Sequence, residues 1–229
     1  MEASDMRGIQ AITAVAALCT AFSAQAALTG YNTKGAFDVA ISGLTGVQTV
    51  DFDSVASGTS FASGTGTGGL TFTYAIPGYT AQVSSTFGTT SGTNYLGLDN
   101  PDTAFYLGDS ITIDFGRVVN AAGLYLVTGN DAQAGDLKLS VAGGSVFNSA
   151  TPDITLSDGK AFYLGLVESD PGLGFSSATI YGVPSGGAFL AFSADDITSA
   201  AVSAVPEPET YALMLAGLGA LAWRRSRKR

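Results

Sequence analysis

The chain has no histidine, and this absence excludes several kinds of chemistry at once. Its 229 residues also include a single cysteine and a single tryptophan. Without histidine there is no Ser-His-Asp or Cys-His catalytic machinery, no zinc site with imidazole ligands, and no side chain that titrates near neutrality by default. The composition therefore points away from the commonest hydrolase and metalloenzyme mechanisms.

Basic residues are also scarce. The chain has 10 Lys and Arg against 19 Asp and Glu, which gives a formal net charge of -9. Between residues 27 and 205 the imbalance is larger, because 15 acidic residues against 4 basic ones give -11. A nucleic-acid backbone requires a net basic protein face. We therefore expect no nucleic-acid partner.

The N-terminal segment has the three parts of a secretory signal peptide. A short polar start is followed by an apolar run over residues 9–22, and then by small residues at Ala24 and Ala26. Signal peptidase requires small side chains at such positions, so residues 1–26 are predicted to be a signal peptide that is cleaved after Ala26. An uncleaved membrane anchor is the alternative. The only cysteine lies in this segment, so the mature chain would have neither disulfides nor thiol chemistry.

The C-terminal segment, residues 205–229, joins three different kinds of sequence. Pro206, Glu207 and Pro208 come first, and their prolines favour an extended stretch that stays accessible to a processing enzyme. Residues 211–223 are apolar and would form a helix of about 20 Å, which can span a bilayer only with help from its interfacial flanks. The chain then ends in five basic residues: Arg224, Arg225, Arg227, Lys228 and Arg229. By the positive-inside rule this end would stay cytoplasmic, and the rest would lie on the outer side of the membrane.

This arrangement resembles the PEP-CTERM sorting signal of Gram-negative bacteria, in which a Pro-Glu-Pro motif, a short hydrophobic helix and an Arg-rich end follow one another. Pro206, Glu207 and Pro208 match the tripeptide residue by residue. The resemblance implies processing by an exosortase, a membrane transpeptidase-like cysteine enzyme. The exosortase would remove the tail near the motif and release or attach the protein at the cell surface or in exopolysaccharide. An ordinary C-terminal anchor with a Pro-rich stem is the alternative.

Residues 27–204 are predicted to form one extracytoplasmic all-β domain. Apolar and polar residues alternate in four segments, as is typical of half-buried antiparallel strands: 70–74, 111–115, 137–141 and 162–166. Five further strands are expected at 47–52, 124–128, 178–181, 188–192 and 197–202. With turn-forming residues between them, these strands predict an antiparallel two-sheet sandwich of the jelly-roll type.

One short helix is expected before the first of these strands. Phe37, Ile41 and Leu44 recur at helical spacing. We expect this helix to cap one open end of the sandwich.

Aspartates at two places in the domain suggest a metal site. Asp53 closes the first of these strands, and Asp195 and Asp196 open the last one. The first and last strands of a jelly roll commonly pair, which would bring these carboxylates together. Calcium takes roughly six to eight oxygen ligands of this kind. Solvated aspartates at strand ends are the alternative.

The domain also loosely resembles the carbohydrate-binding-module-like sandwiches of PEP-CTERM proteins. Their F-D, G-L-T-F and D-D-I elements correspond here to Phe52-Asp53, residues 69–72 and residues 195–197. The resemblance implies a structural calcium with Asp53 and Asp196 as its main side-chain ligands.

These observations predict a protein without catalytic activity, since no nucleophile and base are recognisable. We expect an exported surface or matrix protein that acts structurally or adhesively in exopolysaccharide or biofilm. Its processing partners would be signal peptidase and an exosortase, with transient residence in the inner membrane. The alternative is a calcium-stabilised, lectin-like module that stacks tyrosines on sugar rings. The tyrosines considered for that role are Tyr74, Tyr79, Tyr95, Tyr106 and Tyr163.

Overall fold

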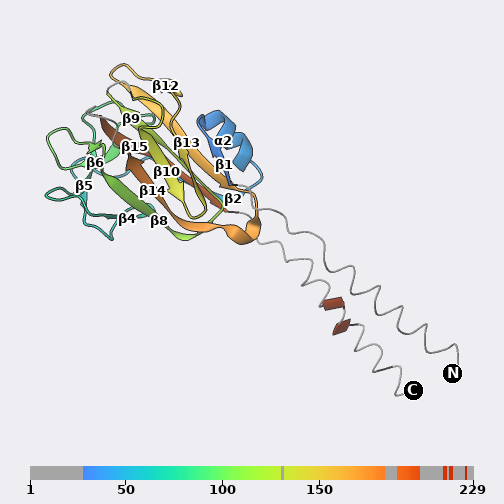
Figure 1. Cartoon of the computed structure of the whole chain (residues 1–229). Coiled ribbons are helices and arrows are strands. Elements are labelled where there is room, and N and C mark those ends of the chain that lie inside the picture. The colour runs from blue at the N-terminus through green and yellow to red at the C-terminus, as the bar shows by residue number, and fades with distance from the viewer. Residues whose placement is uncertain are drawn as a thin grey trace.

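A computed structural model describes residues 28–129, 132–183 and 190–201, together with a few positions near the C-terminus: Met214, Leu215, Gly217, Leu218 and Arg225. In the described part of the chain, two antiparallel sheets stack face to face around a shared apolar core (Figure 1). The predicted antiparallel two-sheet sandwich is therefore confirmed.

The larger sheet has ten strands, seven of which follow one another in hydrogen-bonded order. Its order is β1 (Leu28–Tyr31), β13 (Lys160–Glu168), β9 (Ala121–Thr128), β15 (Ala191–Ala201), β6 (Tyr95–Leu98), β5 (Ala81–Ser84) and β3 (Ser60–Phe61). Three strands pair outside this order. β12 (Ile154–Thr155) pairs with β13, while β2 (Thr45–Val50) and β7 (Phe105–Tyr106) pair with β15.

The smaller sheet has five strands. Its order is β11 (Gly144–Phe147), β10 (Leu137–Val141), β14 (Phe175–Gly182), β8 (Ser110–Val119) and β4 (Thr71–Tyr74). A 3₁₀ turn, η2 (Pro171–Leu173), precedes β14. In β10 the period-two pattern works as predicted, because Leu137, Leu139 and Val141 are buried while the residues between them are partly exposed.

The one described helix longer than a turn, α2 (Lys34–Ile41), lies in a different place from the one predicted. It packs against the outer face of the larger sheet over β13 rather than across an open end of the sandwich (Figure 1). Phe37 is fully buried there, and its ring centroid lies 5.3 Å from that of Tyr163. The physical reason is that β9 and β13 carry apolar residues on both faces, so the outer face also needs a cover.

Two facing glycines make room for this helix. Gly123 on β9 and Gly165 on β13 are partners in the strand register. A Cβ at Gly165 would overlap the Phe37 ring, and a Cβ at Gly123 would overlap the Tyr163 hydroxyl. The glycine that breaks the pattern of 162–166 therefore accommodates the helix, and the strand is buried on both faces instead of one.

The two strands expected at 188–192 and 197–202 belong, as far as they are described, to the single strand β15. The acidic pair Asp195 and Asp196 lies in the middle of this strand instead of opening it. Several short strands, β5 and β6 among them, were not predicted. β6 has a Tyr-Leu-Gly-Leu sequence that is buried at all four positions and shows no alternation.

Candidate functional site

The paired aspartates of β15 lie at an irregularity of the strand. On one side β15 pairs with β9, and this register shifts between Asp195 and Thr198. On its other side β15 pairs with β6 at Ala194 and with β2 from Ile197 onward. Asp196 has φ 51, a left-handed value that bulged strand residues adopt. The bulge places two carboxylates where β15 changes partners.

Both carboxylates bind a loop between β5 and β6, residues 87–94, here called the 87–94 loop. Asp195 Oδ2 accepts hydrogen bonds from the backbone N–H groups of Thr90 (2.9 Å) and Ser91 (3.2 Å). The Thr90 hydroxyl oxygen lies 2.8 Å from Asp195 Oδ2 and 2.9 Å from Asp196 Oδ2, so one hydroxyl serves two carboxylates. Asp195 is fully buried and Asp196 is 9% exposed. The aspartate pair thus satisfies backbone groups that would otherwise lose water on burial.

Asp53 holds the other end of the same loop. Its Oδ1 accepts bonds from the backbone N–H groups of Thr93 (2.7 Å) and Asn94 (3.0 Å). Gly92 has φ 42, and a Cβ there would overlap the Asp53 carboxylate, so the close approach requires glycine. Phe52, next to Asp53, is buried.

The prediction that the first and last of the sequence-expected strands would pair is confirmed, because Val50 of β2 lies opposite Ile197 of β15. Asp53, Asp195 and Asp196 are accordingly brought to one region, around the 87–94 loop. Their oxygens receive N–H and O–H groups, and among the described residues no group of three or more Asp, Glu, Cys or His side chains could hold a metal ion.

A chelator experiment tests this assignment of the aspartates. We expect excess EDTA to leave the melting temperature unchanged, because hydrogen bonds to the 87–94 loop already stabilise the three carboxylates. The measurement is thermal unfolding with and without chelator, and with added calcium. Asp53→Asn serves as control, since it should lower the melting temperature equally in all three conditions. A chelator-induced loss that calcium restores would show that the predicted calcium is bound.

Burial and a neighbouring charge make the Asp195 carboxyl a weaker acid than an ordinary aspartate. Burial first, and then the neighbouring charge of Asp196, raises the pKa of the Asp195 carboxyl to about 6, although its bonds from Thr90 act in the opposite direction. Holding this carboxylate in the ionised form therefore costs folding free energy near neutral pH.

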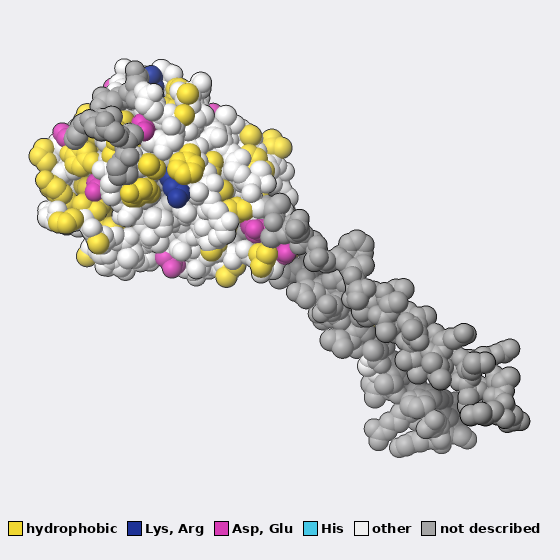
Figure 2. Space-filling view, in the orientation of Figure 1, with side chains coloured by type: hydrophobic (Ala, Val, Ile, Leu, Met, Phe, Trp, Pro, Cys, Tyr) yellow, Lys and Arg dark blue, Asp and Glu magenta, His cyan; other side chains and the backbone are white. Residues whose placement is uncertain are grey.

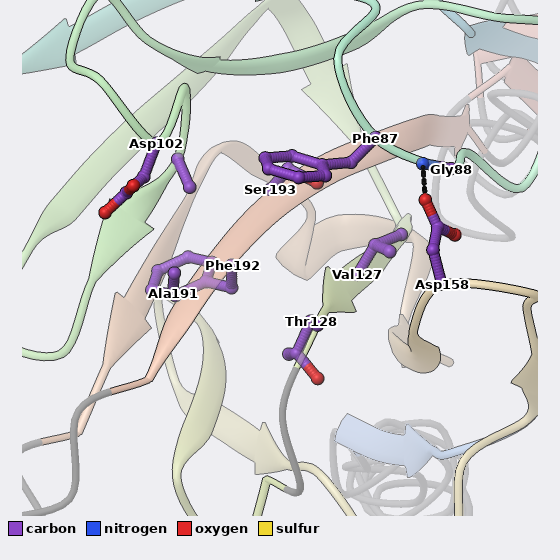
Figure 3. A pocket seen from close by; sticks show the side chains of 11 residues that line it. Phe87, Gly88, Asp102, Val127, Thr128, Asp158, Ala191, Phe192 and Ser193 are labelled. Atoms are coloured by element: carbon purple, nitrogen blue, oxygen red, sulfur yellow. Dashed lines mark hydrogen bonds between the residues drawn. The ribbon is translucent and has the colours of Figure 1, made fainter.

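A hollow of about 280 Å³, here called the Phe87 pocket, lies beside the start of the 87–94 loop. Its floor is formed where β9 and β15 pair, by Val127, Thr128, Phe192 and Ser193 among others. Asp102, Asp158 and Phe87 reach it from loops, and the Phe87 ring lies between the two aspartates in Figure 3. Asp158 Oδ2 accepts a 2.8 Å bond from the Gly88 N–H, so a third part of the chain holds the loop.

None of the tyrosines considered for sugar stacking lines this pocket. Tyr95 and Tyr163 are buried in the domain, and the Tyr74 hydroxyl binds the backbone of Phe61 and Ala81. The aromatic side chain at the pocket is Phe87, which is 51% exposed. The sequence signal that could have identified it is weak, because Phe87 lies in a stretch of Ser, Thr and Gly with no strand pattern.

The predicted sorting residues fall in another part of the chain. Ala24, Ala26, Pro206, Glu207 and Pro208 lie outside the described residues, as do all of the terminal basic residues except Arg225. In the predicted helix over 211–223 the described positions are helical. Within the described residues, no helix has both the length and the apolar character needed to cross a membrane.

The described residues define an all-β antiparallel sandwich with an acidic sequence, and its last strand ends at Ala201. The segment after it matches the PEP-CTERM protein-sorting motif over residues 204–228. The match identifies the tail as a sorting signal and leaves the family of the sandwich open. The protein is thus an exported protein whose membrane-anchored precursor is processed by an exosortase for the cell surface. Comparison with curated proteins gives no match.

Proposed function

We propose that the protein is a non-catalytic component of the bacterial surface or extracellular matrix, with a structural or adhesive role in exopolysaccharide. The observation that carries this proposal is the order of parts along the chain. The strands of the sandwich end at Ala201, and the sorting motif begins at residue 204. The whole described sandwich is therefore the cargo that the sorting signal delivers.

The use of the acidic residues supports a structural role. Asp53, Asp158 and Asp195 each accept backbone N–H groups of the 87–94 loop. These bonds stabilise the fold, because they satisfy backbone N–H groups of the loop. The domain has no histidine or cysteine that could supply a nucleophile and base in their place.

The charge of the domain supports a neutral polysaccharide as its surroundings. Lys34, Arg117, Lys138 and Lys160 are the only basic residues between 27 and 205. In Figure 2 the visible face of the described domain carries scattered acidic side chains and few basic ones. Such a surface is repelled by polyanions, whereas uncharged polysaccharide has no such barrier.

Matrix fractionation of the producing cells tests the proposal. We expect most of the processed protein in the insoluble polysaccharide fraction, and we expect its deletion to weaken the cohesion of that matrix. Restoring the full chain should restore cohesion. The proposal fails if the deletion leaves the matrix unchanged, or if the purified protein cleaves matrix polysaccharide.

A further inference from the structure

The Phe87 pocket has the size of a site for a single ring. Ligand pockets in proteins commonly measure about 300–1,000 Å³, so a hollow of about 280 Å³ lies just below this range. Phe87, an aromatic side chain at its rim, is 51% exposed. Its free face can cover an apolar ring surface.

The polar groups of the pocket are mainly hydrogen-bond acceptors. Asp102 Oδ2 accepts a 2.8 Å bond from the Tyr106 hydroxyl, and Asp158 Oδ2 accepts the bond from Gly88. Bonds from a hydroxyl to a carboxylate are stronger than those between neutral groups. In Figure 3 the two carboxylates lie on opposite sides of the Phe87 ring.

The charges of the lining residues also indicate which ligands the pocket disfavours. None of the described residues that line the pocket is lysine or arginine. A carboxylated, sulfated or phosphorylated ligand would therefore meet the negative charges of Asp102 and Asp158 in the lining. An uncharged ligand with hydroxyl donors at its edge and an apolar face meets no such repulsion.

The aromatic side chain is also held in place before any ligand arrives. Gly88 is bonded to Asp158, and Thr90 is bonded to Asp195 and Asp196, so the chain directly after Phe87 is anchored at two points. A side chain on an anchored loop loses little conformational freedom on binding, which favours affinity.

From these observations we propose that the Phe87 pocket binds one uncharged sugar ring of an extracellular polysaccharide, with Phe87 stacked on the ring and Asp102 and Asp158 accepting its hydroxyl groups. This inference rests on the proposed matrix role and names the group of the matrix that the domain recognises. It assigns no bond cleavage to the site.

The experiment uses the processed protein purified from the surface of the producing cells. It is first applied to an array of oligosaccharides built from neutral hexoses, N-acetylhexosamines, free amino sugars and uronic acids. The affinity for the best-bound neutral oligosaccharide is then measured by titration calorimetry. We expect saturable binding to a neutral class, and Phe87→Ala should weaken it roughly tenfold or more, the size of a lost aromatic stacking contact.

Phe147→Ala is the matched control, because Phe147 is 44% exposed but lies on β11 of the other sheet. It should bind like the unchanged protein. Asp102→Asn should weaken binding several-fold while leaving thermal unfolding unchanged, because it keeps the shape of the side chain.

Absence of binding to every neutral class, a preference for uronic acids or free amino sugars, or equal affinity of Phe87→Ala and Phe147→Ala would overturn the inference. These outcomes are distinguishable from a failure of the matrix role. Fractionation reports where the protein resides, whether or not this pocket is occupied.

Discussion

Replacing Pro206, Glu207 and Pro208 together by alanine is expected to abolish C-terminal processing. The unchanged protein should leave the membrane with its tail removed near this motif, whereas the variant should retain every residue through Arg229. The reason is that the matched segment, 204–228, contains the motif that an exosortase recognises. Intact-mass measurement of the surface and membrane fractions distinguishes the two products.

The control for this experiment alters the neighbouring residues and keeps the motif. Glu209→Ala with Thr210→Ala should be processed normally and should reach the surface. The same mass measurement shows whether residues 1–26 are absent, as the predicted signal peptide requires. A retained tail in the unchanged protein, or a removed tail in the alanine variant, would contradict processing at this motif.

The second large effect is a pH dependence of stability that arises from Asp195. Its pKa is about 6 in the folded protein, against 3.8 as the ordinary value for aspartate. Because the folded pKa is the higher one, the folded state binds the proton more tightly than the unfolded state does between these two values. The contribution of Asp195 to the free energy of unfolding is therefore fully present below about pH 4 and is lost as pH rises through 6.

At about 1.4 kcal/mol for each pH unit between the two pKa values, the loss amounts to about 3 kcal/mol. Asp195→Asn keeps the shape and cannot ionise, so it removes this titration. We therefore expect the difference in unfolding free energy between the unchanged protein and Asp195→Asn to fall by about 2 kcal/mol from pH 4 to pH 7, because part of the total change lies outside this range. Urea denaturation of both proteins at the two pH values measures this difference, because the other titrating groups largely cancel.

Asp196→Asn is the informative comparison for that measurement. It removes the neighbouring charge but leaves the burial of Asp195 unchanged, and burial is the larger cause of the raised pKa. The pH dependence should therefore become smaller without disappearing. A difference between the unchanged protein and Asp195→Asn that stays constant with pH would show that Asp195 titrates as an ordinary surface aspartate.

Much of the fold could be predicted because it rests on local patterns. The alternation in 111–115 and 137–141 correctly indicated strands with one buried face, and both now belong to the smaller sheet. The pattern was less informative for β9 and β13, because both strands are buried on both faces, whereas the alternation at 162–166 indicated one exposed face. α2 covers the outer face of those strands. Its position was predicted wrongly, because the sequence pattern did not show that this face is buried.

The candidate site was less predictable, because it depends on contacts between distant parts of the chain. The sequence correctly indicated that Asp53 would approach Asp195 and Asp196. The calcium ion that the sequence suggested there stays a prediction, and the described structure shows the three carboxylates bonded to the 87–94 loop. Thr90 and Asp195 are 105 positions apart, and no local pattern relates a turn of Ser, Thr and Gly to a buried strand.

The sequence by itself determined where this protein is sent. A sorting signal is recognised as a short linear segment. Its motif, apolar stretch and basic end can therefore be identified from the sequence without knowledge of the fold. Composition likewise excluded histidine- and cysteine-based chemistry. Only the tertiary structure decided what the acidic residues do and where a ligand could bind, because hydrogen-bond partners and pockets are formed by residues that meet through folding alone.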